Sequence, residues 1–172
     1  DVTDLLWKAV TFVRSLPERG AWSPEPDVVA ATHRALKLAA QPSSSPQWLA
    51  GQIGTAVASA QAIPMAFALL ARDPSPRALL QAANLGGDTD TIGAIAGAIL
   101  GASLGVEVFD GYGLAQVEQV SQLDLPSVAT DLLALRDREG GGAAPAAATT
   151  SPNPEKPALA KTLAASPQTC AP

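Results

Sequence analysis

Two aspartates, Asp88 and Asp90, stand one residue apart in the stretch NLGGDTDTIGAIAGAILGASLG, residues 84–105. The nearest basic residues in the sequence are Arg77 before this stretch and Arg136 after it. Two carboxylates about 5 Å apart repel each other by roughly 3 kcal/mol at an effective dielectric constant near 20. A bound divalent cation would remove this repulsion, which makes the pair a candidate metal site. The alternative is that the aspartates only cap the helix that follows.

The spacing of the two aspartates restricts the backbone on which they can act together. Residues two apart in a helix point about 200° away from each other, whereas in an extended or turn conformation they lie on the same side. Gly86 and Gly87 come directly before Asp88 and supply the freedom in φ that a tight turn needs. The GGDTDT motif, residues 86–91, therefore predicts two converging carboxylates at a turn rather than in the middle of a helix.

The donors of the motif are hard oxygen atoms from Asp88, Asp90 and the hydroxyl of Thr91. Such donors suit Mg²⁺, which takes about six oxygen ligands near 2.0–2.1 Å and usually keeps several waters. Manganese fits the same donors. Zinc prefers nitrogen and sulfur, and His33 and Cys170, the single histidine and the single cysteine, lie far away in sequence. We interpret His33 as a core or surface histidine of a helix rather than as a ligand.

Other functional classes fail on specific residues. Asp88, Asp90 and Gly93 occupy positions one, three and six of a calcium loop, but position twelve is Ile99 where an EF-hand needs glutamate. The sequence has neither a Gly-Lys-Ser/Thr phosphate loop nor a G-x-S-x-G nucleophile elbow. Its net charge of −5 argues against a nucleic-acid partner.

The residues after the motif form a run in which every fourth position is glycine: Gly93, Gly97, Gly101 and Gly105. Each glycine inside a helix is less favourable than alanine by about 1 kcal/mol, so something must compensate. Close approach of a second helix would do so. The uncharged run from Thr91 to Val106 is shorter than the roughly 20 residues of a membrane span. We therefore expect this helix at the centre of a soluble helical domain, with its positive N-terminal end beside the metal site.

The segments that must position the motif have helical periodicity almost throughout, and no run of alternating β-branched residues predicts a strand. The chain is thus predicted to be all-α. The segments expected to contain helices are 2–16, 26–40, 43–49, 55–73, 74–86, 91–106 and 126–138. Pro64 is expected either in a first helical turn or at a kink. Residues 47–71 carry no charge, but Gln52, Gln61 and Pro64 interrupt them, which favours a buried helix over a membrane span.

Composition divides the chain in two. Residues 1–136 suit one helical domain, whereas residues 137–172 are rich in Gly, Ala, Pro, Ser and Thr and are predicted to be a disordered tail. A single cysteine excludes an intrachain disulfide and indicates a reducing, cytoplasmic setting.

The stretch NLGGDTDTIGAIAGAILGA, residues 84–102, closely resembles the second metal motif of the ADP-ribosylglycohydrolase family. The likeness extends upstream through GTAVASAQAIPMAFALLARDPSPRALLQAA, residues 54–83. It implies an orthogonal helical bundle that encloses two magnesium ions and hydrolyses the glycosidic bond between ADP-ribose and an acceptor. The acceptor belongs to an ADP-ribosylated protein or small molecule.

Position by position, the resemblance implies that Asp88, Asp90 and Thr91 are metal ligands, and we assign Gly86 and Gly87 to substrate binding. The family's other ligands, a Thr/Ser-Asp-Asp run, lie in its N-terminal half and are absent here, since the VTDL segment at residues 2–5 offers a single aspartate. Residues 1–136 are therefore expected to be the C-terminal portion of an incomplete bundle, to hold half of a two-metal site, and to be inactive without the missing N-terminal half. No general base is assigned. The alternative is a catalytically silent helical module that binds ADP-ribose or a protein.

Overall fold

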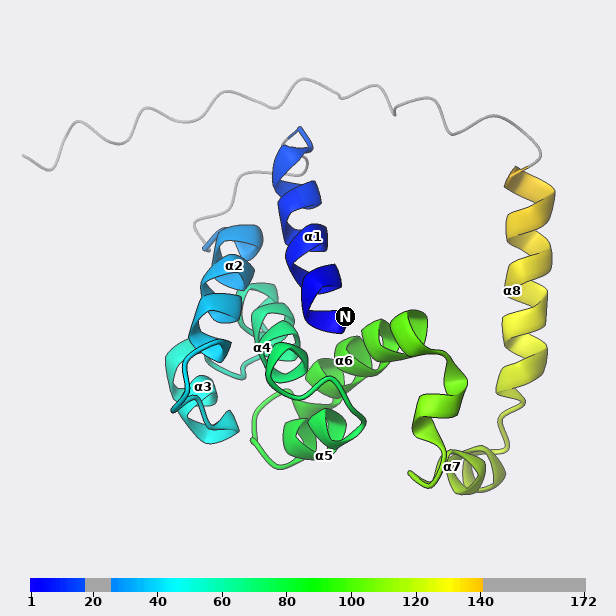
Figure 1. The fold of residues 1–172 in the computed structure, drawn as a ribbon. Coiled ribbons are helices and arrows are strands. Elements are labelled where there is room, and N and C mark those ends of the chain that lie inside the picture. Colours follow the sequence, from blue (N-terminus) through cyan, green and yellow to red (C-terminus); the bar gives the residue numbers. More distant parts are fainter. Residues whose placement is uncertain (18–25, 141–172) are drawn as a thin grey trace, which may run out of the picture.

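The computed structural model describes residues 1–17 and 26–140 of the chain (Figure 1). These residues form eight α-helices and one 3₁₀ helix, with no strand among them, so the predicted all-α class is confirmed. The α-helices are α1 (Val2–Ser15), α2 (Val28–Ala39), α3 (Pro46–Ile53), α4 (Ser59–Arg72), α5 (Arg77–Ala83), α6 (Thr89–Leu104), α7 (Leu114–Ser121) and α8 (Leu125–Gly140), and the 3₁₀ helix is η1 (Val106–Phe109).

Helix α4 is the centre of the fold and contacts α1, α2, α3, α5 and α6. Met65, Ala66 and Leu69 have no exposed surface, and the alanines of this helix let its neighbours approach closely. Pro64 lies in the second turn of α4, so it occupies a helix interior rather than a first turn. The buried face of α4 fixes where α6 can pack, and α6 begins at the GGDTDT motif.

The uncharged stretch 47–71 is not one helix but most of α3 and α4, joined by residues 54–58. Helix α3 ends at Gly54, whose φ of +90° strongly favours glycine. Among the described residues no helix is both long enough and apolar enough to cross a membrane.

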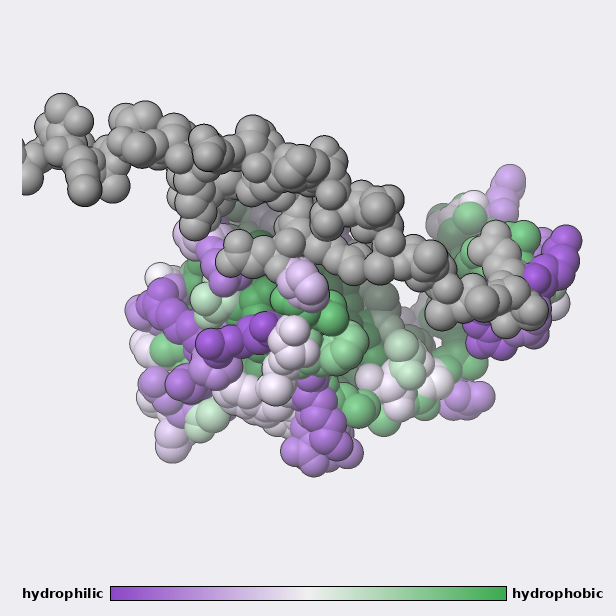
Figure 2. Space-filling view, turned by 90° about the horizontal axis from the view of Figure 1, so that it is seen from above, coloured by the Kyte–Doolittle hydropathy of each residue, from purple (hydrophilic) through white to green (hydrophobic). Residues whose placement is uncertain are grey.

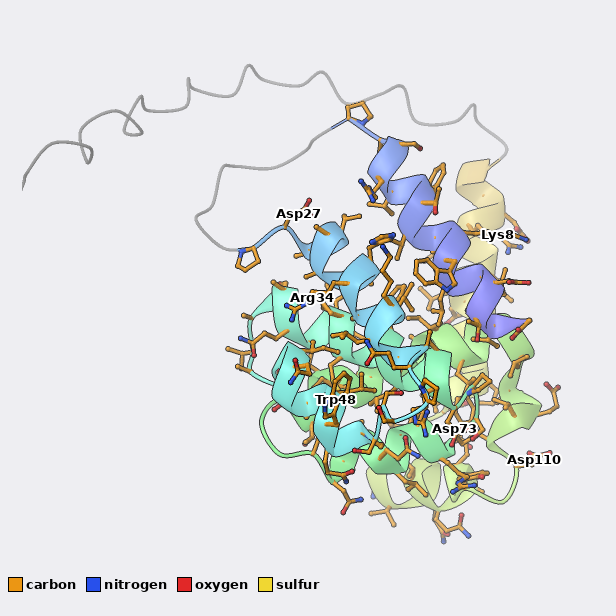
Figure 3. The ribbon with its side chains drawn as sticks, turned by 60° about the vertical axis from the view of Figure 1, so that its left-hand side comes forward. Lys8, Asp27, Arg34, Trp48, Asp73 and Asp110 are labelled. Atoms are coloured by element: carbon orange, nitrogen blue, oxygen red, sulfur yellow. The ribbon has the colours of Figure 1, made fainter. Side chains whose placement is uncertain are left out.

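Helix α2 begins with a side-chain cap. The Asp27 carboxylate, at the start of α2 in Figure 3, accepts hydrogen bonds from the backbone N–H groups of Val29 at 2.8 Å and Ala30 at 3.4 Å. These two N–H groups have no partner inside the helix, so the cap satisfies both.

Replacing Asp27 with alanine is expected to lower the free energy of unfolding by about 1 kcal/mol, because both capping bonds are lost. Urea denaturation followed by circular dichroism measures the change. Asp27→Asn keeps a side-chain oxygen that can accept the same bonds, so its expected loss is much smaller. Equal losses in the two variants would show that the cap does not stabilise α2.

Helix α6 packs on one side only. Ile92, Ala96 and Leu100 are buried on the side of α4 and α5, whereas Ala94 and Ala98 are exposed. Within the described residues the prediction that α6 lies at the centre of the domain is therefore wrong, because only one face of the helix is covered.

The glycines of α6 have unlike surroundings. A Cβ added at Gly97 would lie 3.3 Å from Leu79 of α5, and one at Gly101 would lie 3.5 Å from Phe109 of η1. A Cβ at Gly93 would meet no other group within 4 Å. The expected close approach of a second helix is thus found at Gly97 alone.

Helices α7 and α8 follow η1, and α8 stands apart from the helical body in Figure 1. Val128, Leu132 and Leu135 of α8 are exposed, and Figure 2 shows apolar surface both on this part of the chain and on the body. Helix α8 continues to Gly140, so the first four residues of the predicted tail are helical rather than disordered. The remainder of that tail lies outside the described residues.

Candidate metal centre

The GGDTDT motif is a turn that leads directly into α6. Gly86 and Gly87 have φ values of +74° and +78°, which confirms that both glycines are used for left-handed backbone. Asp88 has φ −85° and ψ 60° and precedes the helix, which starts at Thr89, so Asp90 lies in the first turn. The two aspartates thus lie at the junction of turn and helix and not in a helix interior, as predicted.

The two aspartates of the motif influence each other electrostatically. The pKa of Asp90 is lowered, chiefly by the neighbouring Asp88 side chain and further by the backbone N–H of Thr91, which donates a hydrogen bond to Asp90 Oδ1 at 2.9 Å. Because Asp88 is outside the helix, its side chain escapes the 200° separation that two helical residues would have. Asp90, which is exposed, therefore stays ionised at neutral pH beside a second carboxyl group.

Helix capping does not account for Asp88. Asp88 is the N-cap residue of α6, but its side chain accepts no capping hydrogen bond from the helix. Asp27 and Ser45, the N-cap residues of α2 and α3, do make such bonds. A capping aspartate would use its carboxylate on the N–H groups of the first turn. The Asp88 side chain, which makes no capping bond, is instead the largest influence that lowers the pKa of the neighbouring Asp90 carboxyl group.

Asp88 is also fixed through its backbone. Its N–H donates a hydrogen bond of 2.7 Å to the carbonyl oxygen of Thr55, in the connection between α3 and α4. The sequence did not predict this contact, because a backbone acceptor leaves no residue-type signal and depends on the path of the chain.

The oxygen donors of the motif suit a hard divalent cation, but they are too few to fill its coordination shell. Two carboxylates and the hydroxyl of the exposed Thr91 are oxygen donors of the kind that Mg²⁺ and Mn²⁺ prefer. The N-terminus of α6 carries a partial positive charge, which attracts negative groups such as the side chains of the motif. No cluster of three His, Cys, Asp or Glu residues that could hold a metal occurs in the described part of the chain.

The other residues considered from the sequence lie elsewhere. Asp4 is exposed in the first turn of α1. His33 packs edge-on against Trp7, with ring centroids 5.4 Å apart and an interplanar angle of 85°, which supports its interpretation as a packing residue of α2. Cys170 lies outside the described residues.

Two cavities on the surface have linings that do not include the motif. One, of about 190 Å³, is lined by Arg34, Gln52 and Gln61 among others, and one of about 280 Å³ by Arg77, Gln81 and Asn84 among others. Neither contains Asp88, Asp90 or Thr91. The motif therefore lies outside both of these cavities.

These features define an all-helical protein with an acidic GGDTDT motif at the start of a glycine-rich helix. The chain belongs to the ADP-ribosylglycohydrolase family, whose model matches residues 1–142. This is a family of glycohydrolases. The sequence is 42% identical over 88 residues to a protein of Escherichia coli (strain K12) named "Uncharacterized protein YegU". That match covers 50% of this chain and 26% of the relative, so the chain spans about a quarter of the curated relative's length. No solved structure gives a significant match.

Proposed function

We propose that the complete protein hydrolyses the glycosidic bond between ADP-ribose and an acceptor in a magnesium-dependent reaction, and that Asp88, Asp90 and Thr91 hold a metal ion. The observation that carries the proposal is an Asp88 side chain that makes no capping bond, next to Asp90, in a chain whose residues 1–142 match the glycohydrolase family; the Asp88 side chain also lowers the pKa of Asp90. Manganese would occupy the same donors. The acceptor is an ADP-ribosylated protein or small molecule.

The residues of the motif would have separate tasks. Asp88 and Asp90 hold the cation with their carboxylates, and Thr91 adds its hydroxyl from the first turn of α6. A bound divalent cation supplies Lewis acidity that polarises a water molecule and orients ribose hydroxyls. Gly86, beside which a Cβ would meet no group within 4 Å, leaves its backbone open to the substrate, and Gly87 continues the same turn.

We also propose that the site is completed by residues outside this chain. Two carboxylates and one hydroxyl are fewer than the about six oxygen ligands that Mg²⁺ takes. The resemblance implies a second ion and a Thr/Ser-Asp-Asp run in an N-terminal half that would pack against this one. The chain alone is then inactive, and we place the complete protein in the cytoplasm.

Titration of the purified chain with MnCl₂, followed by the electron paramagnetic resonance signal of free Mn²⁺, tests the metal assignment. We expect saturable binding of one ion per chain at millimolar Mn²⁺ and competition by Mg²⁺, because the donors are hard oxygens. Absence of binding at these concentrations would count against a metal site built by these residues.

The second candidate function is a silent module that binds ADP-ribose or a protein. It is favoured by the lack of a third acidic ligand among the described residues. Calorimetric titration with ADP-ribose in the presence of EDTA separates the two functions. A binding module keeps its affinity without metal, whereas the metal-dependent site loses it.

A further inference from the structure

The backbone of Asp88 is held by a residue distant in sequence. Asp88 precedes α6, so its N–H has no partner within that helix, yet it donates to the Thr55 carbonyl at 2.7 Å. Thr55 belongs to residues 54–58, here called the 54–58 connection, which joins α3 to α4. The direction in which the Asp88 side chain leaves the backbone therefore depends on where this connection lies.

Gly87 allows this contact to form. A Cβ built on Gly87 would lie 2.5 Å from the Thr55 hydroxyl oxygen and would also collide with the Thr55 carbonyl oxygen. Gly86 has nearly the same positive φ, but a Cβ built there meets nothing within 4 Å. The two glycines thus serve different ends: both provide left-handed backbone, and Gly87 alone provides the space that lets the motif approach Thr55.

The 54–58 connection is in turn held by Gln61 in the first turn of α4. The backbone N–H of Ala56 donates to Gln61 Oε1 at 3.0 Å. A Cβ on Gly54 would collide with the Gln61 side chain, so that side chain lies directly against the connection. Because α4 is the buried central helix, these contacts link the core to the metal motif through Gln61, Thr55 and Asp88.

We infer that Thr55 is a positioning residue of the metal site, which orients Asp88 toward Asp90 through its backbone carbonyl, and that Gln61 maintains this arrangement. The effect of Thr55 on metal binding rests on the proposed function, because the orientation of Asp88 matters only if Asp88 holds a cation. Its structural basis does not depend on metal. Partners that orient ligands typically alter metal affinity by about 10–100-fold when they are replaced.

Hydrogen exchange of the Asp88 amide, measured by nuclear magnetic resonance on the metal-free 172-residue chain, tests the contact directly. The amide is expected to be protected in the wild type. Gln61→Leu removes the acceptor for the Ala56 N–H and is expected to accelerate exchange at Asp88 by about tenfold or more, through local opening. Gln61→Glu retains an acceptor oxygen and is expected to restore protection. A purely structural role of Gln61 would instead alter amides throughout α4 and leave no specific effect at Asp88.

A matched pair of glycine variants tests the consequence for the metal. Gly86→Ala and Gly87→Ala place the same side chain at nearly the same positive φ, so they share the backbone strain. Gly87→Ala also displaces Thr55, and it is expected to weaken Mn²⁺ binding by about tenfold relative to Gly86→Ala. If Gly87→Ala fails to fold, the Mn²⁺ affinities of Gln61→Leu and Gln61→Glu are compared instead.

The outcomes separate this inference from the proposed function. Rapid, unprotected exchange of the Asp88 amide in the folded wild type would overturn the positioning role, whether or not Mn²⁺ binds. Loss of protection of the Asp88 amide in Gln61→Leu but not in Gln61→Glu, in a chain that binds no Mn²⁺, would support the positioning of Asp88 and contradict the metal site. If Gly86→Ala and Gly87→Ala both fold and bind Mn²⁺ with equal affinity, Thr55 does not contribute to metal binding.

Discussion

Asp88→Asn and Asp90→Asn are each expected to weaken Mn²⁺ binding by more than about 100-fold, beyond the range associated with residues that only orient ligands. Asparagine keeps the shape of the side chain and one carbonyl oxygen but removes the negative charge that attracts the cation. Because no third acidic group in the described residues forms a metal-holding cluster with these two aspartates, neither charge can be replaced by a neighbour. The signal of free Mn²⁺ in electron paramagnetic resonance measures the change.

Asp110→Asn is the matched control for this experiment. Asp110 is exposed beyond η1, and its replacement changes the net charge from −5 to −4, as do the two motif variants. An affinity within about twofold of the wild type is expected, since an exposed charge away from the ion is screened. Equal weakening by Asp88→Asn and Asp110→Asn would mean that overall charge, and not the motif, attracts the ion.

Leu69→Ala is expected to lower the free energy of unfolding by about 2–5 kcal/mol, which would be a large part of the stability of a small domain. Leu69 lies on the central helix α4 with 0% of its surface exposed. Its truncation leaves a cavity that the tightly packed alanines around it cannot fill. Urea denaturation monitored by circular dichroism measures the loss.

Leu80→Ala makes the same chemical change at a surface position. Leu80 lies on α5 with 57% of its surface exposed, so the expected loss is within about 0.5 kcal/mol. Similar losses for Leu69 and Leu80 would indicate that α4 is not the packing centre of the chain in solution.

The sequence predicted every α-helix of the described residues except α7, because local signals define the others. Apolar periodicity marked α1 and α2, and the structure adds the side-chain cap of Asp27 at the start of α2. Boundaries set by composition were less accurate. Asp137 begins a segment poor in large apolar residues, but α8 continues to Gly140, since a change in composition need not coincide with a helix end.

The surroundings of α6 could not be predicted from its residues. Glycine every fourth position is compatible with a close helix neighbour, but only Gly97 meets one, while Gly93 faces open space. Which face of a uniformly small helix is covered depends on the neighbours that pack there, and α6 offers no polar stripe to decide it.

The backbone turn that carries the candidate site was predicted in part. The types and spacing of Asp88 and Asp90 indicated convergence at a turn, and the positive φ values of Gly86 and Gly87 agree with it. The role of Thr55 had no counterpart in the sequence pattern, because its contribution comes from a backbone carbonyl whose position is set by tertiary structure.

The hydrogen bond between Asp88 and Thr55 also bears on the order of events in folding. It closes a loop of about 30 residues, and the conformational entropy lost in this closure must be offset by the packing of α4 and α5, which lie within the loop. The GGDTDT sequence allows the turn, but the position of the Asp88 backbone depends also on the distant Thr55 carbonyl. The contact that holds the Asp88 backbone therefore exists only once residues 55–88 have folded, although both aspartates are present in any nascent chain that contains the motif.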